Sequence, residues 1–172
     1  AEYSAPYLAH TPMEPINCTA QLIDGRLKIW VPTQAPSVAV ATAARVANIS
    51  VKQVDIDVTL LGGGFGRKIE TDYVVHAVKV AKAIGKPVKV FWPRGEDFSH
   101  DQYRPMGLMR VRIGMNASGV PQAYFMRHVS PSPLFQRGLA SGAEGDNVDG
   151  AINTPYNIAN KRVEYVRLEN KV

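Results

Sequence analysis

The sequence predicts an α+β fold, in which a strand–helix–strand–helix–strand unit is followed by antiparallel strands. Two observations point to the first half: apolar residues alternate in three short runs between residues 27 and 92, and the stretches between these runs carry apolar residues at helical spacing. A third observation points to the second half, where alternation returns at 109–115. We therefore expect one domain over 1–172, with a hairpin plus βαβαβ core at 20–92 and antiparallel strands at 105–168.

The segment AQLIDGRLKIWV predicts a β-hairpin. Asp24-Gly25 suits the two central positions of a type I′ turn, both of which need a positive φ. Beyond this turn, Leu27, Ile29 and Val31 alternate with Lys28 and Trp30, as in a half-buried strand.

Two helices are predicted, one before and one after the strand at 54–60. Pro36 suits the first turn of the earlier helix, and Asn48 readily adopts the left-handed conformation that ends a helix. The later helix lies in ETDYVVHAVKVAKAIGKP, where Gly85 and Pro87 mark its end. Its expected apolar face consists of Val74, Ala77, Val78, Ala81 and Ile84.

The strands of the first half are expected to run parallel, because right-handed crossovers connect parallel strands of one sheet. Their carboxyl ends then share one rim, and open α/β sheets bind ligands at such a rim. Three segments are placed there: PTQAP (32–36), GGGFGRK (62–68) and WPRGEDF (92–98).

The pattern after residue 105 predicts antiparallel sheet. Residues 109–115 alternate, NASG at 116–119 turns the chain back, and a last strand is expected around 161–168. Residues 130–160 are rich in Gly, Pro, Ser and Asn and predict a long loop, which in a compact domain is usually functional or ordered by a partner.

Composition narrows the classes of function. Hydrophobic residues make up 45% of the chain and charged residues 20%, a balance typical of globular proteins. The single cysteine, Cys18, excludes an internal disulfide and a multi-cysteine metal site within this chain. The net charge is +5, but the Lys and Arg residues are scattered rather than gathered in a basic stripe. Nucleic acid is therefore not expected as a partner.

The most specific stretch is GGGFGRK at 62–68, in which four of the first five residues are glycine. Three interpretations are open. A tight turn that needs positive φ would require only one or two glycines. A phosphate loop would need Ser or Thr where Ile69 stands, and a dinucleotide fingerprint would need Gly where Arg67 stands. A bulky polyanionic cofactor would explain the glycines best, since their N–H groups could point at its phosphate or oxo groups while Arg67 and Lys68 add charge.

This stretch, with WVPTQAP upstream of it, resembles the molybdenum-binding subunit of the xanthine dehydrogenase and aldehyde oxidase family. In that family a strand ends in a Thr-Gln pair, and a helix, a strand and a GGGFG loop follow; the spacing from Gln34 to Phe65 fits. HTPMEP (10–15) and RGEDFSHDQYRP (94–105) are also similar to family segments. The arginine after the last glycine, together with MEP, resembles the bacterial branch of isoquinoline 1-oxidoreductase beta subunits and membrane-associated aldehyde dehydrogenases.

The resemblance implies a molybdenum-dependent oxidoreductase that oxidises an aldehyde or N-heterocycle with water. It implies that the Gln34 amide donates to the apical oxygen of the molybdenum and that loop N–H groups lie beside the metal and its pterin. Cofactor sulfurs hold the metal, so no protein ligand to it is expected, and no catalytic residue is expected in this chain. The implied cofactor-binding residues are Gln34, Gly62, Gly63, Gly64, Phe65, Gly66 and Arg67.

Two departures from the family pattern bear on activity. The xanthine-oxidising branch has a substrate-contacting glutamate after the loop lysine, but this chain has Ile69 there and Glu70 one position later, so a purine substrate is not expected. The family's general-base glutamate lies near the end of the full subunit, in a segment to which nothing here is similar. We therefore expect the chain to be a fragment of a longer subunit and inactive on its own.

The resemblance also implies a cofactor and partners. The expected cofactor is molybdenum-molybdopterin cytosine dinucleotide, bound by the full-length parent and not by the isolated fragment. The expected partners are a [2Fe–2S] iron–sulfur subunit, the remainder of the molybdenum subunit, a small-molecule substrate and, as a candidate electron acceptor, a cytochrome c. The residues alone leave open a nucleotide-phosphate-binding enzyme domain and a non-catalytic basic binding module. They do not distinguish a cytoplasmic from a periplasmic location.

For the charged and histidine residues outside the glycine-rich stretch, we expect structural rather than catalytic roles. Glu14 lies near His10 in the sequence, and we expect a structural role for it rather than acid–base chemistry. His76 is expected to be a packed or half-exposed helix residue. An ion-pair network at the rim is the expected role of Arg94, Glu96, Asp97 and His100.

Overall fold

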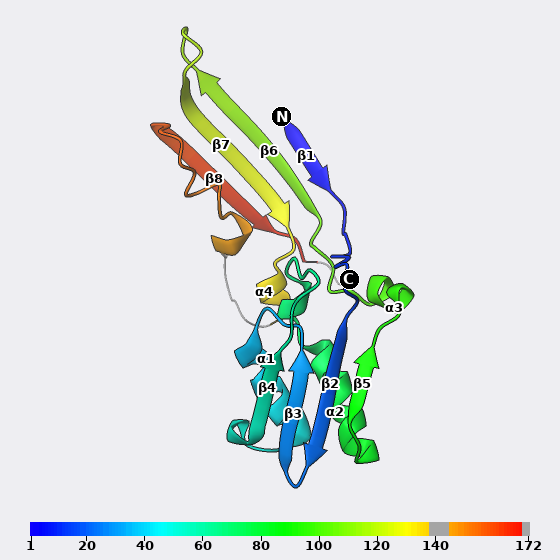
Figure 1. Ribbon diagram of the computed structural model, residues 1–172. Helices are drawn as coiled ribbons and strands as arrows, with labels where there is room; N and C mark the ends of the chain where they lie inside the picture. Colours follow the sequence, from blue (N-terminus) through cyan, green and yellow to red (C-terminus); the bar gives the residue numbers. More distant parts are fainter. Residues whose placement is uncertain (138–144, 170–172) are drawn as a thin grey trace. The chain divides into compact units, whose positions relative to one another are not determined.

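The computed structural model describes residues 1–137 and 145–169, which fall into two compact units (Figure 1). We call residues 9–103 the loop unit, because it contains the glycine-rich stretch. The strand unit combines residues 1–8 with the described residues from 104 onward. Each unit has its own four-stranded sheet, and the mixed helix and strand content confirms the predicted α+β class.

The sheet of the loop unit has the spatial order β4-β3-β2-β5. Its strands are β2 (Asn17–Ile23), β3 (Arg26–Val31), β4 (Val54–Val58) and β5 (Val88–Phe91). β3 and β4 pair in parallel, whereas β2 is antiparallel to both of its neighbours, β3 and β5. β3, β4 and β5 therefore run in one direction, as predicted, and their carboxyl ends lie at the same end of the sheet (Figure 1). One detail differs from the prediction, because the hairpin strand β2 is inserted between β3 and β5.

The β2–β3 hairpin has the predicted turn. Asp24 and Gly25 have φ values of 48° and 75°, the positive angles that a type I′ turn needs. On β3 the predicted core residues Leu27, Ile29 and Val31 are fully buried. On β2, Cys18 is also fully buried, and its burial raises the pKa of its thiol to about 12.

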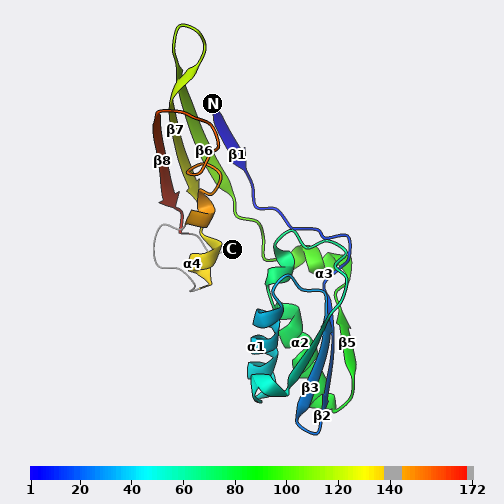
Figure 2. The ribbon, with the colours of Figure 1, turned by 60° about the vertical axis from the view of Figure 1, so that its left-hand side comes forward.

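Two helices cover one face of this sheet (Figure 2): α1 (Pro36–Ala47) and α2 (Asp72–Ile84). Asn48 and Gly85 end them in left-handed conformations, with φ values of 61° and 65°, as predicted. Of the predicted apolar face of α2, Ile84 differs, since it lies in the last turn and is 54% exposed. The buried residues of α2 are Tyr73, Val74, Ala77, Val78 and Ala81.

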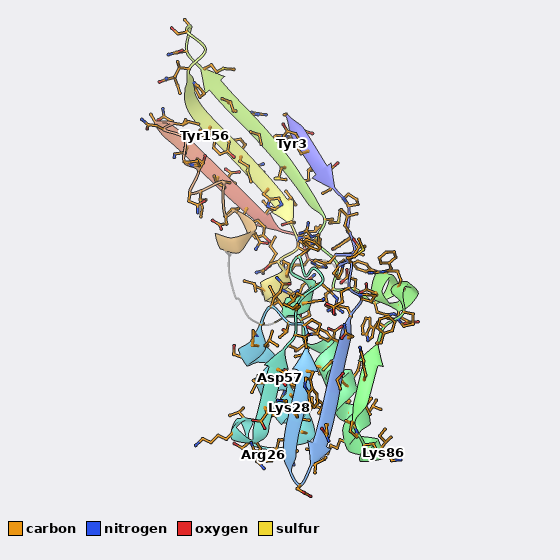
Figure 3. The ribbon with its side chains drawn as sticks, viewed as in Figure 1. Tyr3, Arg26, Lys28, Asp57, Lys86 and Tyr156 are labelled. Carbon is orange, nitrogen blue, oxygen red and sulfur yellow. The ribbon has the colours of Figure 1, made fainter. Side chains whose placement is uncertain are left out.

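The other face of the sheet is polar. Lys28 Nζ lies 2.8 Å from Asp57 Oδ2, and Arg26 lies 3.1 Å from Asp55, so that both pairs link β3 to β4 (Figure 3). These residues alternate along the strands with the buried ones, which is the pattern that a sheet covered on one face requires.

β4 is shorter than predicted. The alternating pattern extends to Leu60, but the strand ends at Val58, and the two side chains are 94% and 47% exposed. β4 is an edge strand whose neighbour β3 ends at Val31, and a last hydrogen bond from Thr59 N–H to the Val31 carbonyl measures 3.2 Å. Beyond this bond the chain has no strand to pair with and enters the glycine-rich stretch. Short helices elsewhere in the unit are η1 (Val51–Gln53), η2 (Arg67–Ile69) and α3 (Arg94–Ser99).

The strand unit contains a second sheet in the order β1-β6-β7-β8. Its strands are β1 (Glu2–Ala5), β6 (Gly107–Met115), β7 (Pro121–Ser130) and β8 (Asn160–Arg167). β6 and β7 form the predicted antiparallel hairpin. Asn116 shapes its turn, because its side-chain oxygen accepts hydrogen bonds from the N–H groups of Ser118 and Val120 at 3.0 and 2.9 Å. The pattern did not predict β1, which pairs with β6.

β8 corrects one prediction, because it pairs with β7 in parallel rather than antiparallel fashion. A parallel pair needs a connection of a dozen or more residues, and the segment between β7 and β8 provides one. This segment includes α4 (Pro133–Gln136) and η3 (Gly145–Asn147), so the predicted loop at 130–160 is partly helical. Residues 138–144 of that predicted loop lie outside the described residues.

Apolar burial is concentrated in the loop unit. Its core joins β2, β3, α1 and α2 in one cluster, whereas among the described residues of the strand unit the buried apolar residues are Met126 and Pro131. Within the described parts of the chain, no helix has the length and apolar character needed to cross a bilayer.

Candidate functional site

The segments that follow β3 and β4 meet at the predicted rim. The N–H of Gly66 donates a hydrogen bond to Gln34 Oε1 at 3.0 Å, and the N–H of Gln34 donates to the Lys68 carbonyl at 2.9 Å. Thr33 Oγ1 donates to the same carbonyl at 3.0 Å. The structure thus brings Gln34 together with residues 62–68, which we call the glycine loop.

At each of the four glycine positions of the loop, the structure shows why a larger residue would not fit. Gly63 and Gly66 have φ values of 94° and 100°, which residues with a side chain rarely adopt. At Gly62 and Gly64, close contacts with neighbouring atoms exclude any larger residue. A Cβ on Gly62 would lie 2.4 Å from Glu14 Cβ, and a Cβ on Gly64 would lie 2.4 Å from Gln34 Oε1. Two of the glycines thus serve turns of the loop, and the other two serve its close contacts with Glu14 and Gln34.

Phe65 is the strained member of the glycine loop. Its φ is 55°, in the left-handed region that a bulky residue rarely occupies. Its side chain is 62% exposed, and its ring lies close to Gly63, where a Cβ would be 3.0 Å from Phe65 Cε2. Strain of this kind persists where the surrounding structure imposes it, and it is concentrated at ligand sites.

Several polar groups of this region lack a partner among the described residues, although Gly64 is buried while Gln34 is exposed. Within residues 1–137 and 145–169, the N–H groups of Gly63 and Gly64 and the side-chain Nε2 of Gln34 have no hydrogen-bond partner. Since Gln34 Oε1 accepts from Gly66, the donor end of the amide is the end left unpaired. Two main-chain donors and one amide donor suit an acceptor-rich, anionic group.

Glu14 holds the start of the glycine loop. Its N–H donates to the Gly62 carbonyl at 2.8 Å, and its Oε2 accepts from the Gly62 N–H at 3.1 Å and from Lys68 Nζ. Burial alone would raise the pKa of the Glu14 carboxyl, but hydrogen bonds from Lys68, Gly62 and Asn17 bring it below the usual value of 4.5. Glu14 thus pairs with Lys68 rather than with His10, in keeping with the predicted structural role.

Arg67 is buried rather than directed at solvent. Its guanidinium is fully buried, forms a two-bond pair with the Asp72 carboxylate at 2.7 and 2.9 Å, and lies 5.6 Å from the centre of the Trp92 ring. Its Nε lies 2.7 Å from Asp101 Oδ1. Burial alone would lower the pKa of Arg67, but Asp72 and Asp101 raise it, so the side chain stays charged. Arg67 and Lys68 were expected to add charge towards a ligand, and instead these charges are neutralised inside the protein.

Asp101 is a site residue that the sequence did not single out. Its side chain is 1% exposed, and its carboxylate accepts from the His10 N–H and lies 3.2 Å from His10 Nδ1. Burial alone would raise the pKa of Asp101, but hydrogen bonds from His10 and the charges of His10 and Arg67 lower it. One signal was present in the sequence, because Asp101 lies in RGEDFSHDQYRP (94–105), the segment that is similar to the family, three residues beyond the predicted rim segment.

The remaining charged residues of the rim form two separate side-chain pairs rather than the connected network that was predicted. Arg94 pairs with Asp97 and donates to the Met13 carbonyl at 2.9 Å, and His100 lies 3.0 Å from Glu96. Burial raises the pKa of Asp97, and the charge of Arg94 offsets this only in part. His76, on α2, is exposed rather than packed or half-exposed as predicted, and it stacks on Trp92, with 5.7 Å between ring centres. In the part of the chain that the structure describes, no group of three or more His, Cys, Asp or Glu side chains is placed to hold a metal ion.

Comparison with protein families places this geometry in context. Residues 1–170 match the model of the molybdopterin cofactor-binding domain. Two curated relatives are 36% identical to the chain: a membrane-bound aldehyde dehydrogenase [pyrroloquinoline-quinone] from Gluconacetobacter polyoxogenes over 118 residues, and an isoquinoline 1-oxidoreductase subunit beta from Brevundimonas diminuta over 115 residues. These matches cover 68% and 66% of this chain but 15% of each relative.

Solved structures agree on the fold. The aldehyde oxidoreductase from Desulfovibrio gigas matches 95% of this chain and 18% of its own, with a TM-score of 0.75 at 21% identity. The aldehyde oxidoreductase from Desulfovibrio desulfuricans matches 97% of this chain and 19% of its own, with a TM-score of 0.76 at 19% identity. The chain thus spans less than a fifth of the relatives and structures that it matches here.

Proposed function

Because the chain belongs to the molybdopterin cofactor-binding domain family, we propose that its glycine loop and Gln34 form one wall of the cofactor site in a molybdenum hydroxylase. The substrate class that we propose for the whole enzyme is an aldehyde or an N-heterocycle. Names of relatives support this class, since they include an isoquinoline 1-oxidoreductase and an aldehyde oxidoreductase molybdenum-binding subunit. The shares of the relatives that are covered support a longer subunit as the functional protein.

The observation that carries the proposal is the orientation of the Gln34 amide. Its oxygen accepts from Gly66 at 3.0 Å, so its NH₂ group is fixed as the end that can donate to a ligand. The unpaired N–H groups of Gly63 and Gly64 lie in the glycine loop. Gly64 lies so close to the Gln34 side chain that a Cβ on Gly64 would clash with it. A pterin cofactor with oxo and phosphate oxygens has the acceptors that such donors require.

The other loop residues have supporting roles in this proposal. Gly66 allows a backbone turn of the loop and Gly62 allows its close contact with Glu14, while Phe65 forms an exposed apolar wall beside the donors. Arg67 acts through its buried pair with Asp72, which fixes the end of the loop. When bound, the cofactor supplies the electron acceptor for oxidation of the substrate carbon, with water as the source of oxygen.

The complete reaction requires groups that we assign to other parts of the enzyme. We propose that the general base comes from the remainder of the molybdenum subunit and that electrons leave through a [2Fe–2S] subunit, with a cytochrome c as a candidate acceptor. The proposed form of the cofactor is the cytosine dinucleotide. The isolated chain is then expected to bind little cofactor and to show no turnover.

Metal analysis of the full-length parent tests the proposal. When the parent is produced with its cofactor machinery, we expect about one molybdenum per subunit. Bound pyrroloquinoline quinone without molybdenum would contradict the proposal, as would magnesium-dependent binding of ATP or NAD at the glycine loop. Salt-sensitive binding to DNA or RNA would instead favour a basic binding module.

Substitution of Gln34 tests the role of its amide. Gln34→Glu keeps the oxygen that accepts from Gly66 but removes the NH₂ donor. We expect turnover by the parent to fall about 10- to 100-fold, because the lost hydrogen bond would be made to a charged group. The melting temperature should stay close to that of the wild type, since Gln34 is exposed. Unchanged turnover in Gln34→Glu and Gln34→Ala would contradict the assignment.

A further inference from the structure

Asp101 links two segments that lie far apart in the sequence. Its Oδ2 accepts from the main-chain N–H of His10 and lies 3.2 Å from His10 Nδ1, while its Oδ1 lies 2.7 Å from Arg67 Nε. The side chain is 1% exposed, so the carboxylate has little access to water. A buried charge is retained only when such partners compensate for its lost hydration.

Both partners of Asp101 touch the end of the glycine loop. Arg67 directly follows Gly66, and the Arg67 N–H donates to the Gly64 carbonyl at 2.9 Å. His10 packs against Gly66, because a Cβ on Gly66 would lie 3.5 Å from His10 Nε2. The end of the loop is therefore held from two sides by groups that share one carboxylate.

We propose that Asp101 is a positioning residue for the cofactor-binding loop. It holds Arg67 and His10 in fixed relation, and through them it fixes Gly64 and Gly66, although it does not touch a ligand itself. Glu14 does the same at the start of the loop, through Gly62 and Lys68. This inference rests on the proposed function for its consequence in catalysis, but the restraint on the loop stands on its own.

Asp97 offers a matched control. Its side chain is also 1% exposed and also pairs with an arginine, Arg94. Its hydrogen-bonded connection to the neighbourhood of the loop runs through Arg94 and the main chain of Met13, and its charge also acts on Arg67 without a direct bond. Any effect of removing a buried carboxylate as such should therefore appear in Asp97→Asn as well as in Asp101→Asn.

Amide hydrogen exchange of this chain tests the restraint without any cofactor. We expect exchange in the peptide containing residues 60–69 to become about tenfold faster or more in Asp101→Asn, because the ion pair with Arg67 and the charge that His10 faces are lost at the loop end. Peptides from α1 and α2 should exchange as in the wild type, and Asp97→Asn should leave the loop peptide nearly unchanged. Loop exchange in Asp101→Asn that is no faster than in Asp97→Asn would overturn the proposal.

A second variant decides the question if Asp101→Asn does not fold. His10→Ala removes the imidazole beside Gly66 but keeps the Asp101–Arg67 pair, and we expect a smaller acceleration of the same peptide. No acceleration in His10→Ala would then overturn the proposal.

The full-length parent separates this inference from the proposed function. Absence of molybdenum from the wild-type parent would refute the proposed function, while the exchange result would still decide the role of Asp101. If the wild type holds molybdenum, we expect Asp101→Asn to retain less of it through gel filtration than Asp97→Asn. Equal retention in both variants would overturn the link from loop position to cofactor binding.

Discussion

A side chain at Gly62 would clash with Glu14, whereas a side chain at Gly64 would clash with Gln34, and this difference has measurable consequences. The contact of Gly62 is with Glu14 Cβ, an atom fixed by the backbone, whereas the contact of Gly64 is with the far end of the Gln34 side chain. A Cβ can be accommodated at low cost only where the opposing atoms can move. The same substitution should therefore affect mainly stability at one glycine and mainly function at the other.

Gly62→Ala and Gly64→Ala test this distinction. We expect Gly62→Ala to lower the free energy of unfolding by about 1–3 kcal/mol, because overpacking against Glu14 must shift the backbone. Gly64→Ala should cost less than about 1 kcal/mol, since the exposed Gln34 can move aside, but it should reduce turnover of the parent as strongly as Gln34→Ala does. Urea titrations and steady-state rates provide the two measurements.

Gly95→Ala is the control for this pair. In α3 a Cβ on Gly95 would meet no atom within 4 Å, so neither the free energy of unfolding nor the turnover of the parent should change by much. Equal losses of stability in Gly62→Ala and Gly64→Ala would show that the Gln34 side chain is not free to move.

At the scale of elements, the start of α2 depends on a buried ion pair rather than on an ordinary cap. Thr71, the residue before the helix, makes no side-chain capping bond. Instead, the carboxylate of Asp72 in the first turn accepts hydrogen bonds from both terminal nitrogens of Arg67. The carboxylate also suits the positive end of the helix dipole. Helix α2 and the glycine loop are thus tied together by one side-chain contact.

The substitution Asp72→Asn should destabilise the protein more than the loss of an ordinary surface ion pair does. We expect a loss of about 2–4 kcal/mol in the free energy of unfolding, because Arg67 would remain buried with less compensating charge. Asp55→Asn breaks the exposed pair with Arg26 and should cost less than about 1 kcal/mol. Both tryptophans, Trp30 and Trp92, lie in the loop unit, so their fluorescence in urea follows this unit. Similar losses in the two variants would contradict a special role for the Arg67–Asp72 pair.

The elements could be predicted where the signal was local. The Asp24-Gly25 turn and the left-handed Asn48 and Gly85 depend on backbone preferences of single residues, and the meeting of Gln34 with the glycine loop follows from the direction of β3 and β4. Long-range pairings were missed. The parallel direction of β8 depends on the course of a long connection, and the choice of Asp101 as the partner of Arg67 depends on distances in space that no periodicity encodes.

At the scale of the whole molecule, buried and partly buried carboxylates make stability depend on pH. Glu14 and Asp101 have pKa values lowered from the usual 4.5 and 3.8, so they favour the folded state while ionised. Their stabilisation is complete above these usual values and is lost as the pH falls through the lower folded pKa values. Asp97 has a raised pKa and acts in the opposite sense, because its contribution is lost as the pH rises through that value.

We therefore expect the free energy of unfolding of the loop unit to decline as the pH falls below about 4.5, with Asp97 offsetting part of the decline. Glu14→Gln should be less stable than the wild type at pH 7, and the gap should narrow as the pH falls below 4.5, because the carboxyl then takes up its proton more readily in the unfolded state than in the folded state. Urea titrations followed by tryptophan fluorescence measure both curves. Parallel curves over this range would show that Glu14 does not contribute to the pH dependence.

The burial of Cys18 gives this chain an internal reporter. With no exposed surface and a thiol pKa of about 12, the sulfur is closed to alkylating reagents while the β2–β3 region is folded. Since the chain has one cysteine, each molecule that takes up a label has exposed this strand at least once. Labelling rates could thus count openings of the loop unit in crude mixtures, without an introduced probe or a change of sequence.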